Sequence, residues 1–182
     1  MSTQGPYFAG TIVDDNSVGT ITWGNVSNAG ATDSVYASST SGMVTQSHYL
    51  KFTNFGFSIP SGSTISELQI RFRRKGTASA IKDYRSRIVL AGVIGTVDYL
   101  DTNFWSTSEE TAITTGLFEG SPYSAGDINN SGFGWAISVD HQAPGTADID
   151  SLAITVTHLA SSSVFLSGPT ILRQAVKRAA NY

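Results

Sequence analysis

The chain has 182 residues, which suits one domain of ordinary size, and it contains no cysteine. The lack of cysteine excludes disulfide frameworks, thiolate metal sites and cysteine nucleophiles. Only 14% of the residues are charged and the formal net charge is −3, while glycine, serine and threonine are abundant, so the composition favours strands and turns over helices.

The N-terminal residues 1–18 are polar and rich in turn formers, and they predict an arm outside the folded domain. The first ten residues have neither a basic start nor an apolar run, so we expect no signal peptide. Residues 19–23 predict a short strand. Residues 25–42 predict a long loop with one strand around Val35, Tyr36 and Ala37.

Strong alternation begins at residue 47 and continues to residue 158. The clearest segments are 64–75, 81–94, 133–139 and 152–158, each with apolar side chains at every second position. Turn signals such as 59–63 and 142–146 separate them. The pattern predicts an all-β domain over 19–159, an antiparallel β-sandwich of jelly-roll type.

The composition changes after the last strand. Residues 160–169 predict a linker, and Pro169 near a first helical position predicts a short C-terminal helix over 170–182. An apolar stripe with basic side chains beside it suits docking to a partner. The predicted docking residues are Ile171, Leu172, Arg173, Val176, Lys177 and Arg178.

Charge is unevenly distributed along the chain. Residues 51–87 hold eight of the eleven basic side chains, whereas residues 88–172 hold nine acids and no Lys or Arg. If strands 64–75 and 81–94 pair, then Arg71, Arg73, Arg85 and Arg87 share one outward face. This basic face is either solvated or an interface between subunits; the lack of interleaved aromatics disfavours nucleic acid.

Candidate catalytic and metal-binding residues are few. Asp148 and Asp150 are two residues apart on one strand and could hold calcium, although such pairs are common in turns. The pairs Glu109–Glu110 and Asp98–Asp101 could serve glycoside hydrolysis, which needs two carboxylates. The three histidines are His48, His141 and His158; none lies in a two-ligand motif, and His158 is expected in the core.

Aromatic residues in predicted loops are a further candidate feature. Tyr99, Phe104, Trp105 and Tyr123 could stack on sugar rings if they are exposed, and otherwise they cover the core or contact a neighbouring subunit. A glycan site would need Trp105 or Tyr123 exposed beside polar groups in a concave surface.

Parts of the sequence resemble a set of small β-sandwich proteins encoded among the structural genes of tailed bacteriophages. The resemblance covers roughly residues 23–157, through 33–37, 48–65, 68–73, 127–134 and 150–156, with the run Phe-Gly-Phe-Ser-Ile-Pro-Ser-Gly at 55–62 its most specific part. These proteins are virion components without a known catalytic site, so the resemblance implies no active residues.

These observations lead to one main interpretation and two alternatives. We expect a non-enzymatic phage structural protein in the virion, a capsid decoration or accessory protein docked through its terminal segments onto capsid or tail subunits. We further expect a homo-oligomer with no cofactor, metal, nucleic acid or membrane partner. The first alternative is a neck or tail component, or a receptor- or glycan-binding module at a tail or fibre; the second is a carbohydrate-active enzyme.

Overall fold

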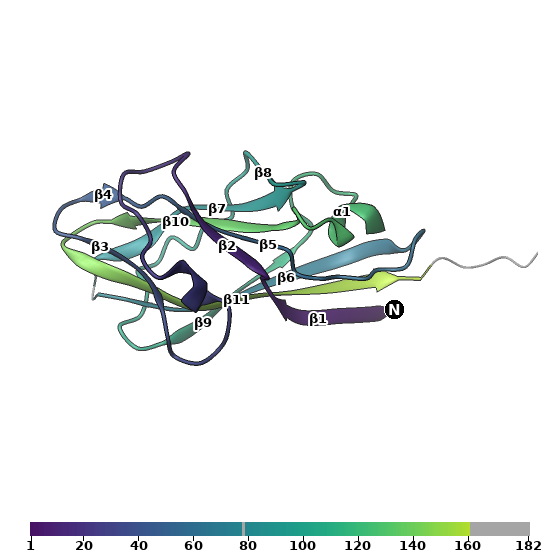
Figure 1. Cartoon of the computed structure of the whole chain (residues 1–182), viewed down its shortest axis with the longest axis horizontal. Coiled ribbons are helices and arrows are strands. Elements are labelled where there is room, and N and C mark those ends of the chain that lie inside the picture. The colour runs from purple at the N-terminus through teal and green to yellow at the C-terminus, as the bar shows by residue number, and fades with distance from the viewer. Residues whose placement is uncertain (78, 161–182) are drawn as a thin grey trace, which may run out of the picture.

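The computed structural model describes residues 1–77 and 79–160, and they form two antiparallel β-sheets packed face to face (Figure 1). The expected all-β sandwich is therefore confirmed. Sheet A contains β1 (Ser2–Phe8), β3 (Ala37–Ser41), β6 (Thr64–Gly76), β9 (Glu110–Gly116) and β11 (Gly145–Leu159). Sheet B contains β2 (Thr11–Asp15), β4 (Thr45–Gln46), β5 (Tyr49–Thr53), β7 (Ile81–Leu90), β8 (Val93–Ile94) and β10 (Gly134–His141).

The strand order is that of a jelly roll. Sheet A runs β1-β11-β6-β9, with β3 also paired to β11, and sheet B runs β2-β5-β10-β7-β8. From β5 to β11 the chain crosses between the sheets at nearly every connection, so strands adjacent in sequence seldom pair. Two antiparallel sheets, here of five and six strands, joined by such crossing connections are typical of a jelly roll.

The core lies between the inward faces of the two sheets. Leu68, Ile70 and Phe72 on β6 face Trp135 and Ile137 on β10, and each is at most 4% exposed. The alternation seen in the sequence produces these faces, because successive side chains of a strand point to opposite sides. Two short helical segments, η1 (Val26–Ala29) and α1 (Ala125–Asn129), lie in the connections.

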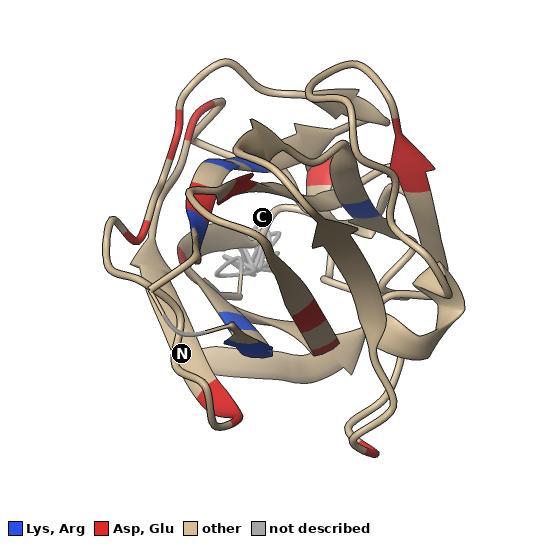
Figure 2. Ribbon diagram, turned by 90° about the vertical axis from the view of Figure 1, so that its left-hand side faces the viewer, with Lys and Arg blue, Asp and Glu red and all other residues tan. Residues whose placement is uncertain are grey.

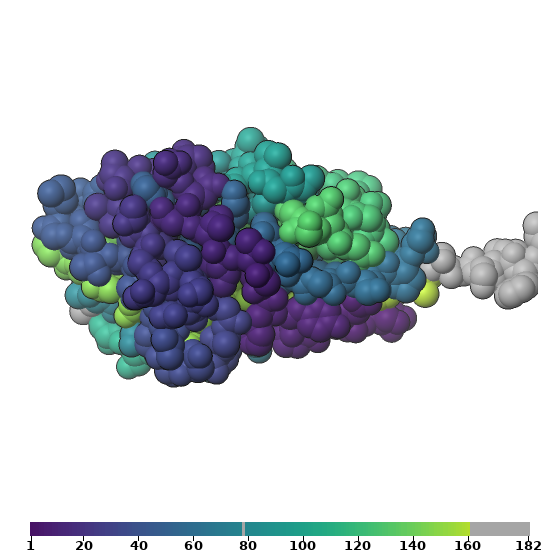
Figure 3. Space-filling model, in the orientation of Figure 1, coloured from purple at the N-terminus to yellow at the C-terminus, as the bar shows by residue number. Residues whose placement is uncertain are grey.

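The N-terminal segment differs from the prediction. Instead of an arm over 1–18, β1 pairs with β11 from Ser2↔His158 to Phe8↔Ala153, and β2 pairs with β5. Figure 3 shows the segment as part of the surface of the sandwich. Both are edge strands in which no side chain is fully buried, and backbone hydrogen bonds hold them to their sheets, so their sequences carry no apolar alternation.

The strand predicted over 19–23 is also absent. Within this segment Ile21 forms an isolated bridge to Ser47, and the next residue, Gly24, forms another to Ser38. Trp23 is buried, and its indole N–H donates to the His48 carbonyl at 2.9 Å. The sandwich therefore begins at Ser2, and residues 19–23 anchor a loop against it.

The C-terminal predictions lie outside the described residues. They comprise residues 161–169 of the linker and the whole helix over 170–182, with its six docking residues. Among the described residues, no helix is long and apolar enough to cross a membrane.

Candidate functional site

The four predicted outward arginines do not share one face. Arg71 and Arg73 lie on β6 in sheet A, whereas Arg85 and Arg87 lie on β7 in sheet B. The two strands do not pair, because β6 lies between β11 and β9 while β7 lies between β10 and β8. Basic and acidic positions accordingly occur on both layers (Figure 2). The prediction of a single basic face is therefore wrong, because that prediction assumed that β6 and β7 pair as a hairpin.

Most of these arginines have acidic partners within the same chain. Arg85 and Arg87 both donate to Asp98, at 2.7–2.9 Å, and Arg73 pairs with Glu109. Burial alone would raise the pKa of Asp98, but the hydrogen bonds and charges of Arg87 and Arg85 outweigh it and lower that pKa. The role of these arginines in contacting another subunit stays a prediction.

One concave feature of the described residues is a cleft of about 530 Å³ at the edge of the sandwich. It lies between β6 and β9 of sheet A, β7 of sheet B and the loop 98–101. Its size falls within the range of about 300–1,000 Å³ typical of small-molecule sites. The lining residues are Phe72, Arg74, Asp83, Ser86, Asp98, Tyr99, Leu100, Asp101, Ala112, Ile113 and Thr114.

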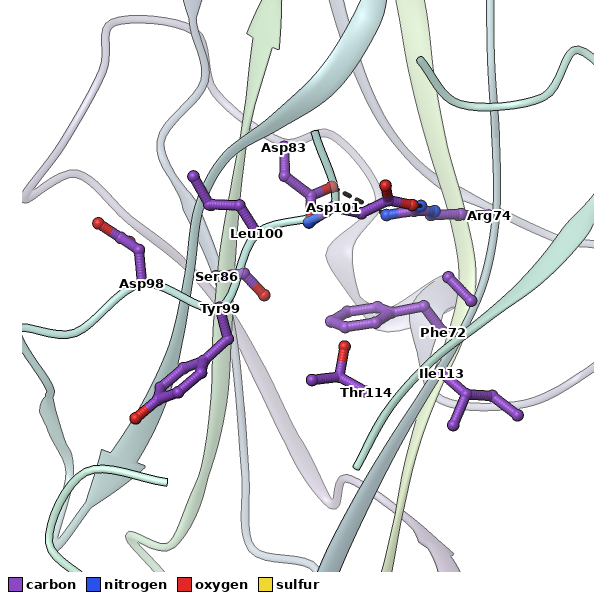
Figure 4. Close-up of a pocket in the computed structure, with 11 residues that line it drawn as sticks. Phe72, Arg74, Asp83, Ser86, Asp98, Tyr99, Leu100, Asp101, Ile113 and Thr114 are labelled. Carbon is purple, nitrogen blue, oxygen red and sulfur yellow. Dashed lines mark hydrogen bonds and ion pairs between the residues drawn. The ribbon is translucent and has the colours of Figure 1, made fainter. Parts of the chain in front are cut away.

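Arg74 organises the acidic end of this cleft. It is only 2% exposed, and its guanidinium donates to Asp83 at 2.8 Å and to Asp101 at 2.6 Å (Figure 4). It also donates to Glu110 at 3.1 Å. The guanidinium carbon also lies 4.7 Å from the centre of the Trp105 ring, in cation–π geometry. One cation thus ties β6 to β7, to β9 and to the loop 98–105.

The carboxylates around Arg74 differ in their environment. Asp83 accepts from Arg74, from the Trp105 indole at 2.8 Å and from the Asp101 amide at 3.0 Å, but burial dominates and raises its pKa. At Asp101, burial is outweighed by hydrogen bonds from the Asn103 amide and from Arg74, so its pKa is lowered. Three carboxylates against one guanidinium leave this cluster with a formal charge of −2.

The other end of the cleft combines hydroxyls and apolar surface. The hydroxyls of Ser86 and Thr114 point into the space, and the Phe72 ring lies beside Thr114 (Figure 4). Leu100 and Ile113 stand at the rim and are 40% and 55% exposed. The Ser86 hydroxyl accepts from the Trp135 indole at 2.9 Å, so its own proton remains to be donated.

Of the four predicted loop aromatics, only Phe104 is largely exposed, at 48%. Trp105 is 2% exposed and Tyr123 is 4% exposed, so the feature on which a glycan site was expected to depend is absent at these two residues. Tyr99 packs against Phe118 and Trp135, at ring-centre distances of 4.7 and 5.8 Å. Burial raises the pKa of Tyr123 to about 12.

The carboxylates proposed for glycoside hydrolysis form ion pairs with arginine side chains. Glu109 binds Arg73 and the Tyr36 hydroxyl, Glu110 and Asp101 bind Arg74, and Asp98 binds two arginines. A general acid in a glycosidase needs a raised pKa, whereas those of Asp98 and Asp101 are lowered. The Asp98–Asp101 pair therefore lacks the electrostatics of a general acid.

The calcium candidates serve structural contacts. Asp150 lies at a bulge of β11, is fully buried and accepts from the backbone amides of Asp33 and Ser34. Asp148 accepts from the Ser38 hydroxyl at 2.5 Å. In the part of the chain that the structure describes, no three His, Asp or Glu residues are grouped to hold a metal ion. His158 is buried, as expected, and so is His141, whose pKa burial lowers.

Sequence reasoning missed Arg74 and Asp83, the two most buried charges of the cleft. Arg74 was not singled out as a site residue, although the inward series Leu68, Ile70 and Phe72 continues directly to position 74. Asp83 faces inward because β7 has an irregularity at Tyr84, where Ser138 pairs with Arg85 and Val139 with Asp83. The sequence offers no signal for that bulge.

No protein-family model and no curated protein matches the sequence. The solved structures that match include a family 35 carbohydrate-binding module from Clostridium thermocellum, 20% identical with a TM-score of 0.36, covering 86% of this chain and 98% of that chain. The cellulose-binding domain of Cellulomonas fimi β-1,4-glucanase C is 11% identical with a TM-score of 0.36, covering 86% and 91%. A CBM35 from Paenibacillus barcinonensis is 18% identical with a TM-score of 0.29, covering 84% and 100%.

These matches are too distant to carry an argument about function. We expected a capsid decoration protein docked through its terminal segments. That interpretation is wrong, because the predicted N-terminal arm contains two strands of the sandwich. The structures named above are not virion proteins and lend it no support. The resemblance to phage proteins and the virion location are not tested and stay predictions.

Proposed function

We propose that this protein is a non-catalytic binding module for neutral carbohydrate and that the cleft at the sandwich edge is its site. The observation that carries the proposal is the pairing, in one cleft of about 530 Å³, of hydrogen-bonding groups with apolar surface. A sugar presents hydroxyls that both donate and accept, together with C–H faces that pack on apolar side chains. The Thr114 hydroxyl can donate and accept, and Leu100 and Ala112 supply the apolar contact.

The charges of the cleft favour a neutral ligand over an acidic one. The Arg74 cluster has a formal charge of −2, so a phosphate, sulfate or uronate would meet like charge. Carboxylate oxygens are strong acceptors for hydroxyl donors, and charge-assisted hydrogen bonds of this kind are the stronger ones. Asp101, on the exposed loop 98–101, offers such an acceptor at the cleft.

The proposal does not depend on aromatic stacking. With Trp105 and Tyr123 buried, affinity has to come from hydrogen bonds and from apolar contact within the cleft. A site of this kind gives modest affinity, because each hydrogen bond contributes only about 0.5–1.5 kcal/mol net.

The test is a glycan microarray containing neutral and acidic oligosaccharides, followed by titration calorimetry with the ligand that binds. Thr114→Val removes one hydroxyl at nearly constant shape and should weaken binding roughly two- to thirteenfold, the equivalent of one hydrogen bond. Ala112→Leu fills the cleft and should abolish binding. Thr115→Val, on the outward face of the same strand, is the matched control and should change nothing.

Two results would overturn the proposal. One is the absence of binding to any neutral glycan by protein that is correctly folded. The other is binding that Ala112→Leu leaves intact, since this would place the ligand elsewhere on the surface.

A further inference from the structure

Strand β9 leaves one edge of sheet A open. It pairs with β6 on one side, and among the described residues no strand pairs with its other side. Such an edge presents unpaired backbone N–H and C=O groups, and proteins usually protect it with lysine, proline, a bulge or a very short strand. β9 has seven residues, pairs with β6 without irregularity and contains neither lysine nor proline.

The side chains of β9 also suit contact with another strand. Thr111, Ile113 and Thr115 are exposed, with Ile113 at 55%, whereas Glu110, the one charged residue of the strand, is bound to Arg74. Threonine and isoleucine have high strand propensity. The edge therefore combines unsatisfied backbone groups with an exposed apolar residue at its centre.

The sequence of β9 indicates that the other strand is a second copy of the same strand. Residues 111–115 read Thr-Ala-Ile-Thr-Thr, which is nearly the same in both directions. In an antiparallel pair with a twofold axis at Ile113, the two Ile113 side chains meet and each Thr111 faces Thr115 of the second copy. Glu110 faces Gly116 of the second copy, so no like charges are opposed.

We propose that two copies of the chain pair antiparallel through β9, which joins their two A sheets into one continuous sheet. This assigns a surface to the homo-oligomer expected from the sequence. Ala112, Ile113 and Thr114 also line the cleft, so the two clefts open beside the shared interface. The pairing itself does not depend on what the cleft binds.

A single cysteine tests the register directly, because the chain has none of its own. In Ile113→Cys the two thiols face each other across the axis, where the Cα atoms of an antiparallel pair lie about 4.5–5.5 Å apart, within the range of disulfides. We expect mild oxidation at low micromolar concentration to convert most of this variant to a covalent dimer. Val93→Cys, 70% exposed on the edge strand β8 of sheet B, is the control and should stay monomeric under denaturing electrophoresis.

Equal cross-linking of the two variants, or none in Ile113→Cys, would overturn the proposed register. Sedimentation of the unmodified chain supplies the second measurement. We expect a species of twice 19.3 kDa that Ile113→Lys converts to monomer and Val93→Lys does not. A monomer at every concentration, or a dimer that survives in folded Ile113→Lys, refutes pairing through β9.

Discussion

Replacing Arg74 by methionine tests whether the buried charge cluster holds the edge of the sandwich together. Arg74 is 2% exposed and Asp83 is 7% exposed, so neither group has bulk water as a substitute partner. Methionine keeps much of the side-chain volume but removes the cation. Asp83 would keep its hydrogen bonds from the Trp105 indole and the Asp101 amide, yet it would lose its counter-charge.

The expected loss is large. Removing one partner of a buried ion pair costs about 3–5 kcal/mol, because an uncompensated charge remains buried. For a protein of this size, about 1 kcal/mol shifts Tm by roughly 2–4 °C, so Arg74→Met should lower Tm by roughly 6–20 °C at pH 7. Arg71→Met is the matched control; that residue lies outward on the same strand, and the change should stay within about 0.5 kcal/mol.

The pH dependence of the stability of Arg74→Met tests specifically whether the lost stability comes from the charge of Asp83. Burial already raises the pKa of Asp83, and removing Arg74 takes away the main opposing effect, so that pKa rises further. A carboxyl whose folded pKa exceeds its unfolded pKa gains stability as the pH falls and it takes up a proton. The deficit of Arg74→Met should therefore shrink between pH 7 and pH 5.

Urea and thermal unfolding at the two pH values measure this effect. The double variant with Asp83→Asn, which removes the orphaned charge, should recover part of the loss at pH 7. The reasoning fails if Arg74→Met unfolds within about 2 °C of the parent at pH 7, or if its deficit is the same at both pH values.

Three further predictions follow from other contacts. The two arginines lower the pKa of Asp98, so the stability that depends on Asp98 is present above its unfolded pKa of about 3.9 and is lost as the pH falls through its lower folded pKa. Asp98→Asn should therefore cost about 1 kcal/mol at pH 7 and progressively less in acid, measured by urea unfolding. Gly134→Ala places a Cβ 1.8 Å from the Phe52 carbonyl oxygen and should cost about 1–3 kcal/mol or prevent folding, whereas Gly42→Ala, with nothing within 4 Å, should be nearly neutral by thermal unfolding. Ser124 caps α1, and Ser124→Ala should lower stability by about 1 kcal/mol, measured in the same way.

The sandwich could be predicted from the sequence because apolar side chains alternate along its core strands. On β6 the alternation reflects one buried and one half-buried face, whereas β10 is buried on both faces and alternates large apolar with small or polar side chains. Edge strands show no such alternation of apolar and polar side chains. β1 is mostly exposed on both faces and is held by backbone hydrogen bonds to β11, which every residue type can make except proline. Its sequence therefore resembled a flexible arm.

The cleft could not be predicted for a different reason. It joins residues from β6, β7, β9 and a loop, and only the crossing connections of the jelly roll bring these together. Pairing β6 with β7, as a hairpin would, places Arg85 and Arg87 beside Arg71 and leaves Arg74 as one more surface charge. The acids of residues 88–172 pointed to a partner for the basic segment, and that partner proves to lie largely in the same chain.

The charge cluster also gives a physical reason for an open cleft at this edge. An apolar interior would collapse until its side chains filled the space at normal packing density. Arg74 instead holds β7, β9 and the loop 98–105 at distances set by hydrogen bonds of 2.6–3.1 Å to one carboxylate of each, and Trp105 covers the guanidinium from one side. Side chains held by ionic contacts cannot move inward without leaving a charge unpaired. The cleft beside them therefore stays available to a polar ligand, and its stability and its binding capacity should be lost together when Arg74 is replaced.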